Sequence, residues 1–377
     1  MSAVRKVSRF VPMVCLLTLL VVMIVVYGAN EQGKENVAAP MKTVRVGRFL
    51  IDVPANARVA LGLGLVEGFE VARYDESHTA FAARLLKREA ELAAKSNMLG
   101  QKNIESIKEV QHLGFSGKVF VHGRYRGYGI EHGQRKYFET ISVEGYAHKA
   151  GGTYSFVADT YDPERASVLP ALLGQLADHA ENDIPSEPGF CISGALLRDP
   201  SSPTRSESVA MSASLPGHPD LGIRFWTNSA ATEGGSLLKR DEDAMGPLTR
   251  ARTRVLRKGV RTINGHAGEE VAIKLTELNF ATVFSFVWET PGSGDNVLIP
   301  HLVLELDTGM SPQAGGDPVQ SSLDEDAALL LWNQISSSIR LRPAGHAQLA
   351  GTGPATPLRH MLAKAGTTVP VQAPTLH

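Results

Sequence analysis

Cysteine is nearly absent from this chain, whose 377 residues include only Cys15 and Cys191. Cys15 lies within a long apolar run near the N-terminus, where it cannot pair with Cys191, so we expect no internal disulfide. Two cysteines are also too few for a cysteine-based zinc site. The stability of the fold must therefore come from burial, for which a hydrophobic fraction of 43% is ordinary.

An excess of charge is absent too. Lysine and arginine number 38, and aspartate and glutamate 39, which leaves a formal net charge of −1. No overall field then attracts nucleic acid or acidic lipid, so we predict no nucleic-acid partner. The length exceeds what one hydrophobic core ordinarily supports, and the sequence therefore predicts two domains.

Catalytic signatures are also missing. The nearest approach to a nucleophile elbow, residues 114–117 (GFSG), lacks the G-x-S-x-G spacing. Neither an H-E-x-x-H helix nor a phosphate-binding or dinucleotide-binding loop occurs in the sequence. We therefore predict no catalytic residue, no metal ligand and no cofactor.

The N-terminus carries an apolar run, residues 10–26, in which Thr18 is the only polar side chain. Its length corresponds to roughly 25 Å of helix, enough to cross the core of a thin bilayer. Arg5, Lys6 and Arg9 precede it, which by the positive-inside rule places the rest of the chain outside the cytoplasm. The run predicts an inner-membrane anchor and a periplasmic protein.

A cleaved signal peptide is the alternative for residues 1–27. Residues 26–29 (VYGA) form a passable cleavage site, although the apolar run is slightly long for a signal. Residues 28–41 are small and polar and predict a flexible tether, whereas the Pro/Gly/Thr-rich residues 344–377 predict a disordered tail.

The first folded part, residues 42–182, predicts an antiparallel meander with two helices. Residues 78–96 place Phe81, Leu85 and Leu92 on one stripe of a helix. Alternation of apolar and polar residues then predicts strands at 118–125, 136–148 and 153–160, with turns at 127–133 and 149–152. A second helix is predicted over 163–180.

The second folded part, residues 189–343, repeats this layout. Asn264-Gly265 predicts a tight hairpin, and residues 280–289, apolar on both faces, predict a central strand. The closing helix is predicted to begin with a capping box, Ser322-x-x-Glu325, and to bury Trp332. The fold class is therefore α+β, with two domains that each combine a mainly antiparallel sheet with one or two helices.

Two sets of polar residues are candidates for a metal site or for acid/base chemistry. His112, His122 and His132 recur every ten residues, but without a local ligand pair they predict solvated strand-end histidines rather than a metal site. Asp159, Asp162 and Glu164 form an acidic corner that is better explained as the start of a helix than as an acid/base pair.

A basic stretch offers a candidate for partner binding. Arg250, Arg252 and Arg254 alternate, so in a strand they would line one face. A solvated sheet face is the ordinary explanation. The functional hypothesis is that these guanidinium groups contact an acidic protein surface.

Several short motifs occur in order along both parts of the chain. The motifs in the first part are Gly47–Pro54 (GRFLIDVP) and Arg88–Leu92 (REAEL). Those in the second are Gly189–Ile192, Leu215–Leu221 (LPGHPDL), Arg254-x-x-Arg257-x-Gly259-x-Arg261, Gly265-x-x-Gly268-Glu269-Glu270, Phe286-x-Trp288, Leu331-Trp332 and Ser338–Pro343 (SIRLRP). Together these motifs resemble those of the type VI secretion immunity proteins that neutralise phospholipase toxins. Their order across residues 42–343 is more specific than any single motif.

This resemblance implies a periplasmic binding protein, not an enzyme. It implies a two-domain, claw-like inhibitor that grips the lid region of a cognate secreted lipase. It transfers no contact residue to this chain. The alternatives that the sequence leaves open are a membrane-anchored periplasmic hydrolase with an unrecognised site and a structural envelope protein.

Overall fold

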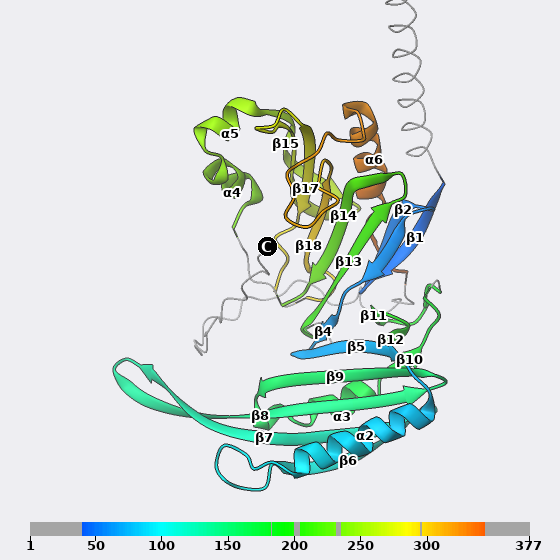
Figure 1. The fold of residues 1–377 in the computed structure, drawn as a ribbon, viewed down its shortest axis with the longest axis vertical. Helices are drawn as coiled ribbons and strands as arrows, with labels where there is room; N and C mark the ends of the chain where they lie inside the picture. The colour runs from blue at the N-terminus through cyan, green and yellow to red at the C-terminus, as the bar shows by residue number, and fades with distance from the viewer. Residues whose placement is uncertain (1–39, 182, 200–203, 231–234, 295, 344–377) are drawn as a thin grey trace, which may run out of the picture.

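The computed structural model describes residues 40–181, 183–199, 204–230, 235–294 and 296–343 (Figure 1). The apolar run at 10–26, most of the tether and the tail at 344–377 lie outside the described residues. No helix within the described residues is long and apolar enough to cross a membrane.

The described elements are mostly strands. The strands are β1 Met41–Val46, β2 Phe49–Pro54, β3 Arg58–Leu61, β4 Gly64–Val66, β5 Phe69–Asp75, β6 Ile104–His112, β7 Phe115–Glu131, β8 Gln134–Lys149, β9 Gly152–Tyr161, β10 Leu176–Asp178, β11 Gly189–Ile192, β12 Ala195–Arg198, β13 Glu207–Leu215, β14 His218–Asn228, β15 Thr253–Ile263, β16 His266–Thr276, β17 Thr282–Glu289, β18 His301–Asp307 and β19 Arg340–Leu341. The helices are α2 His78–Ala93, η1 Pro163–Arg165, α3 Val168–Leu173, α4 Leu237–Ala244, α5 Pro247–Arg252 and α6 Glu325–Ser338.

One long antiparallel sheet runs through both halves of the chain. In the described residues it has thirteen strands, in the order β15-β16-β17-β18-β14-β13-β4-β5-β9-β8-β7-β6, with β3 also paired to β13. This confirms the predicted α+β class with mainly antiparallel pairing. Residues 280–289 were predicted to form a central strand, and β17 does lie between β16 and β18.

Figure 1 shows two lobes stacked along the long axis. We call β5–β9 with α2 and α3 the N-lobe, and β13–β19 with α4–α6 the C-lobe. The β1–β2 hairpin belongs spatially to the C-lobe, because β2 pairs with β19 through Leu50 and Arg340. The first strands of the fold therefore close the core around its last helix.

The helices form where the sequence pattern predicts an apolar stripe. Ser77 caps α2 by accepting from the Ala80 amide at 3.2 Å, and the helix buries Phe81, Leu85 and Leu92 as predicted. At the other end of the fold, α6 buries Trp332 against β17, which confirms the predicted core position.

Two predictions about helix ends are wrong. The helix predicted over 163–180 ends at Leu173, because the following residues pair as β10 with β12, where Leu176 is fully buried opposite Leu197. The capping box at Ser322 does not form. Asp324 is the N-cap of α6 instead, accepting from the Ala327 amide at 2.8 Å, while the Ser322 hydroxyl contacts His218.

One predicted hairpin turn is confirmed and another is wrong. Asn264 and Gly265 turn at φ 45° and 89° between β15 and β16, as predicted. The turn predicted over 127–133 is wrong, since β7 continues to Glu131 and only His132 and Gly133, at φ 52° and 79°, make the turn. The two strands stay paired through this segment, from Tyr125 opposite Thr140 to Glu131 opposite Gln134, so the chain stays extended.

Candidate functional site: two exposed ends and a buried junction

The β7–β8 hairpin leaves the sheet as a free arm, formed by residues 124–140 and visible at the lower left of Figure 1. The pairing of β6 with β7 ends at His122, and the pairing of β9 with β8 ends at Ile141. Within the described residues, both edges of the arm are therefore unpaired. Its exposed large apolar side chains are Tyr125, Tyr128, Ile130, Tyr137 and Phe138.

Aromatic pairs hold the two strands of the arm together. Tyr128 lies directly opposite Tyr137, with ring centroids 6.2 Å apart, and Tyr125 contacts Phe138 diagonally at 6.3 Å. The Tyr125 and Phe138 rings lie over Gly127, where a Cβ would come within 2.6 Å of the Phe138 ring. A side chain at 127 would displace these rings, so glycine is what this face requires.

A second exposed apolar surface lies where α5 meets the turn between β16 and β17. Leu248, Leu278 and Phe280 are exposed there, Leu278 by 80% and Phe280 by 85%. Phe280 has φ 66°, a backbone conformation that a bulky residue rarely adopts. We call this surface, together with Arg250 and Arg252, the α5 end.

The predicted arginine row has a different geometry from the one expected. Arg250 and Arg252 lie on α5, which begins at Pro247, and only Arg254 lies on β15, so the prediction of one strand face is wrong. Arg252 donates to the carbonyls of Leu248 (3.3 Å) and Thr276 (3.2 Å), which ties α5 to the end of β16. Arg254 forms an ion pair with Glu325 of α6.

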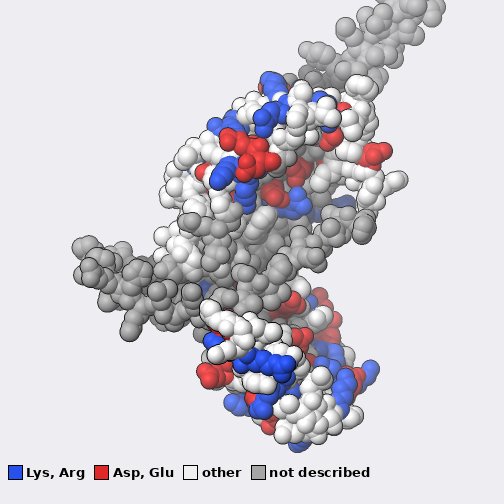
Figure 2. Space-filling model, turned by 90° about the vertical axis from the view of Figure 1, so that its left-hand side faces the viewer, with Lys and Arg blue, Asp and Glu red and all other residues white. Residues whose placement is uncertain are grey.

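The two ends point the same way. In Figure 1 the α4–α5 region of the C-lobe and the arm of the N-lobe both project to the left. Figure 2 faces this side: the upper end shows carboxylates gathered between cations, and the lower end shows cations and carboxylates among uncharged surface. A partner approaching from this side would meet both lobes.

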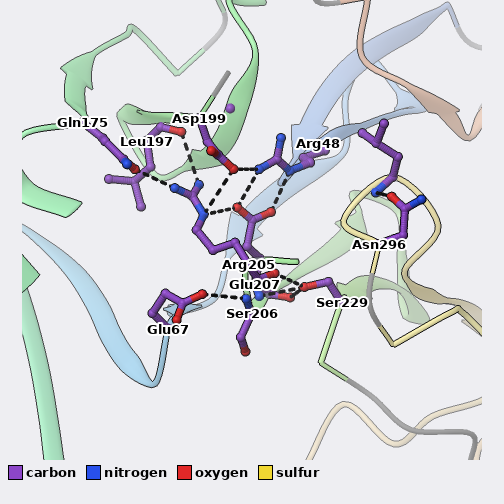
Figure 3. Close-up of polar contacts among 12 residues, drawn as sticks. Arg48, Glu67, Gln175, Leu197, Asp199, Arg205, Ser206, Glu207, Ser229 and Asn296 are labelled. Atoms are coloured by element: carbon purple, nitrogen blue, oxygen red, sulfur yellow. Dashed lines mark hydrogen bonds and ion pairs between the residues drawn. The ribbon is translucent and has the colours of Figure 1, made fainter. Parts of the chain in front are cut away.

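A buried ion network lies where the lobes join (Figure 3). Arg48, from the turn after β1, donates to Glu207 at 2.7 and 2.8 Å and to Asp199 at 2.8 Å. Arg205 donates to Glu207 at 2.5 Å and to Gln175 at 2.6 Å. The two guanidinium groups and two carboxylates are almost fully buried and balance in charge.

The neighbouring residues complete the network. Ser229 accepts from the Glu207 amide at 2.8 Å and donates to the Arg205 carbonyl at 2.7 Å. Glu67, from the β4–β5 turn, accepts from the Ser206 amide at 2.9 Å, so the network reaches the N-lobe. Burial disfavours the charge of Arg48, but the hydrogen bonds and charges of Glu207 and Asp199 outweigh it and raise the pKa of Arg48.

A second charged cluster fixes α2 onto the sheet of the N-lobe. Glu144, buried on β8, accepts from Arg88 Nε at 2.9 Å and Tyr146 Oη at 2.8 Å, and His122 Nε2 lies 3.0 Å away. Burial alone would raise the pKa of Glu144, but the hydrogen bonds from His122, Arg88 and Tyr146 lower it well below its usual range.

This cluster predicts a pH-dependent stability. Because the pKa of Glu144 is lower in the folded state, its contribution is complete above the unfolded value of about 4.3 and is lost as the pH falls below it. We expect Glu144→Gln to cost about 2 kcal/mol at pH 7, since Arg88 loses its buried counter-ion and keeps only the exposed Glu91, and much less near pH 3. Urea unfolding at both pH values measures this. An equal loss at both would show that the charge of Glu144 is unimportant.

The other candidate polar residues have structural partners. His122 is buried against Glu144, so the prediction that it is solvated is wrong. Asp162 accepts from the Glu164 amide at 2.9 Å at the start of η1, the helix-initiating role predicted for it. No group of three or more His, Cys, Asp or Glu side chains within the described residues is arranged to hold a metal ion.

The sequence alone did not reveal the network or the arm. Arg48 and Glu207 are 159 residues apart, and nothing local marks either as buried. The arm carried no one-sided alternating pattern: Tyr125 and Tyr128 fall on opposite faces, and the glycines between and after them suggested a turn.

A two-lobed frame whose exposed apolar ends face one side has the architecture of a protein that acts by binding a partner. Two family models match the chain in order: residues 42–161 match the Tle cognate immunity protein 4 N-terminal domain, and residues 183–344 match its C-terminal domain. The chain therefore belongs to the Tle cognate immunity protein 4 family, whose members are immunity proteins rather than enzymes. None of the curated proteins compared with it matches.

Solved structures show the same fold. The protein is similar to a chain of the Tle4-Tli4 complex, with a TM-score of 0.66 and 24% identity over 82% of this chain and 99% of that one. It is also similar to the immunity protein TplEi of the type VI secretion system (T6SS) of Pseudomonas aeruginosa. The apo form of TplEi gives a TM-score of 0.65 and 22% identity over 81% of this chain and 98% of that one. TplEi with an "L" peptide gives 0.64 and 24% over 81% and 99%.

Proposed function

We propose that this protein binds a type VI secretion phospholipase effector in the periplasm and blocks it by occlusion, which protects the producing cell. The observation that carries the proposal is the match of both immunity domains in order along one chain. One of the similar structures is that of a Tle4-Tli4 complex, which supports a lipase effector as the partner. Tight occlusion requires about 1,600 Å² of buried surface and no catalytic group.

The organisation of the chain fits this role. We place the two domains at residues 42–182 and 189–343, and we infer that residues 10–26 anchor them in the inner membrane unless residues 1–27 are removed as a signal. A lipase works on membrane, so an inhibitor tethered there would meet it at high effective concentration. The support for the anchor is the apolar run and its basic flank.

Protection of cells tests the proposal. The lipase encoded beside this gene is directed to the periplasm of a sensitive strain, with and without this protein. We expect the full chain to restore growth and the chain lacking residues 1–40, which stays in the cytoplasm, to fail. The purified domain, residues 40–343, should suppress phospholipid hydrolysis by that lipase at an equimolar ratio. Hydrolysis of phospholipid by the domain itself, or no suppression, would contradict the proposal.

The α5 end is our candidate for one contact with the effector. Arg250 and Arg252 flank the exposed Leu248, Leu278 and Phe280, an arrangement of apolar anchors with cationic neighbours that is typical of binding sites. Arg254, the third predicted contact, is held by Glu325 and lies next to this surface along the chain. The residue contacts themselves stay a prediction.

Charge reversal tests this surface. We expect Arg250→Glu with Arg252→Glu to weaken binding of the lipase at least tenfold at low salt and less at high salt, because exposed charges act mainly on association. Calorimetric titration at two salt concentrations measures the effect. Lys95→Glu with Lys108→Glu, exposed on the N-lobe, changes net charge equally and should leave affinity unchanged. Equal weakening by both pairs would show a non-specific charge effect.

A further inference from the structure

The arm exposes apolar side chains on both of its faces. From the strand register, Tyr125 and Phe138 share one face, on which they lie over Gly127. Tyr128, Tyr137 and Ile130 lie on the other face, since successive side chains alternate. Ile130 is 74% exposed and Tyr137 68%.

The fold does not account for this exposure. The rings contact one another across the arm, but no core lies above or below them, because the arm has left the sheet. A free two-stranded ribbon is only marginally stable in water, and large aromatic side chains are the residues that contribute most to protein interfaces. Aromatic residues exposed on both faces indicate a surface that is buried on both sides in a complex.

The charge of the arm indicates the kind of surface that buries it. Four cationic side chains, Arg124, Arg126, Arg135 and Lys136, stand against two carboxylates, Glu131 and Glu139. Glu139 is already shared by Arg124 (2.7 Å) and Arg126. The Arg135 guanidinium lies over the Tyr128 ring, 4.7 Å from its centroid. Lys136 forms an ion pair with Glu131, and Arg124 also pairs with Glu105 of β6 at 2.6 Å. Cations still outnumber carboxylates on the arm, so it presents a small net positive charge beside its aromatic faces.

We propose that the arm inserts into an apolar groove of the effector with an acidic rim, so that both faces of the arm are buried. This inference rests on the proposed function, and it names a contact element in the N-lobe separate from the α5 end. A bilayer surface or a flat protein surface would cover one face and leave the other in water. Burial of both faces requires a groove.

Variants of each face test the insertion. Tyr128→Thr with Tyr137→Thr removes the rings of one face, and Tyr125→Thr with Phe138→Thr those of the other; threonine keeps the preference for a strand. We expect each pair to weaken binding of the lipase encoded beside the gene at least tenfold in calorimetric titration. Tyr128→Phe with Tyr137→Phe keeps the rings and should stay within about threefold. Leu86→Thr, on the outer face of α2 and 68% exposed, is the control and should not change affinity.

The outcomes separate the two proposals. If the unaltered protein does not bind the lipase, the proposed function fails. If it binds and both face variants bind equally well, the arm is not a contact and this inference is overturned. If only one face matters, the contact is flat and insertion is wrong. In another outcome, the protein co-sediments with anionic phospholipid vesicles while the face variants do not. If those variants also keep their affinity for the lipase, the arm binds the membrane and this inference is overturned. Arg135→Glu leaves the rings in place and should weaken lipase binding more at low salt, which checks the result independently of arm folding.

Discussion

Replacing Glu207 by alanine is expected to lower the free energy of unfolding by about 3–5 kcal/mol, because it leaves Arg48 and Arg205 buried with one carboxylate, Asp199, between them. Breaking a buried ion network costs far more than breaking an exposed pair, since the remaining charges cannot return to water. Urea unfolding followed by circular dichroism measures the loss. The same variant loosens the contact between the lobes, so binding of the lipase should weaken as well.

An exposed ion pair is the matched control for Glu207. Arg224 contacts Glu305 at 2.9 Å and Asp307 at 3.0 Å on the open face of the C-lobe, with its side chain about half exposed. Arg224→Ala should cost less than 1 kcal/mol. Glu207→Gln keeps the shape of the side chain but removes its charge, so its loss in free energy of unfolding should be close to that of Glu207→Ala. A loss for Glu207→Ala no larger than that for Arg224→Ala would show that the network is not an essential part of the junction.

Trp332→Ala is expected to destabilise the C-lobe by about 3–5 kcal/mol and to lower its melting temperature by about 10 °C. The indole is fully buried, stacks on Phe286 with ring centroids 5.5 Å apart, and donates from Nε1 to Glu270 at 2.5 Å. Its removal leaves a cavity and takes a donor from a buried carboxylate.

Two further substitutions on α6 calibrate the Trp332 result. Trp332→Phe keeps the ring stacking but loses the hydrogen bond to Glu270. Its stability should therefore lie between those of the unaltered protein and Trp332→Ala. Leu330→Ala changes a partly exposed residue on the same helix and should cost less than about 0.5 kcal/mol. Calorimetric melting of residues 40–343 compares the three. An unchanged melting temperature for Trp332→Ala would mean that the ring adds nothing to the core.

Local patterns predicted most of the individual elements. The stripe of Phe81, Leu85 and Leu92 predicted α2, and Asn264-Gly265 predicted its hairpin, because each depends on residues close in sequence. The errors fell where a neighbour far along the chain decides. Leu176 joins a strand because β12 is available to pair with it, and Asp324, rather than Ser322, caps α6 because Ser322 bonds His218.

The candidate contact residues were predictable only in part. The sequence drew attention to Arg250, Arg252 and Arg254, but a helix starting at Pro247 places the first two on α5. Phe280 was predicted to lie in the central strand over 280–289, but β17 begins at Thr282 and leaves Phe280 in the turn, and Leu278 gave no sequence signal. Their exposure is a property of the β16–β17 turn, which the structure alone reveals.

The sequence by itself determined the class of fold, the likeness to an immunity family and the absence of recognisable catalytic motifs. Each of these depends only on composition, periodicity or the local order of residues. Tertiary structure alone decided that β2 packs with α6 and pairs with β19, that Arg48 meets Glu207 across the junction, and that residues 124–140 stand free as an arm. These depend on which distant strands pair and on which strands end early. Such long-range pairing reflects the free energy of the whole sheet and leaves no local mark in the chain.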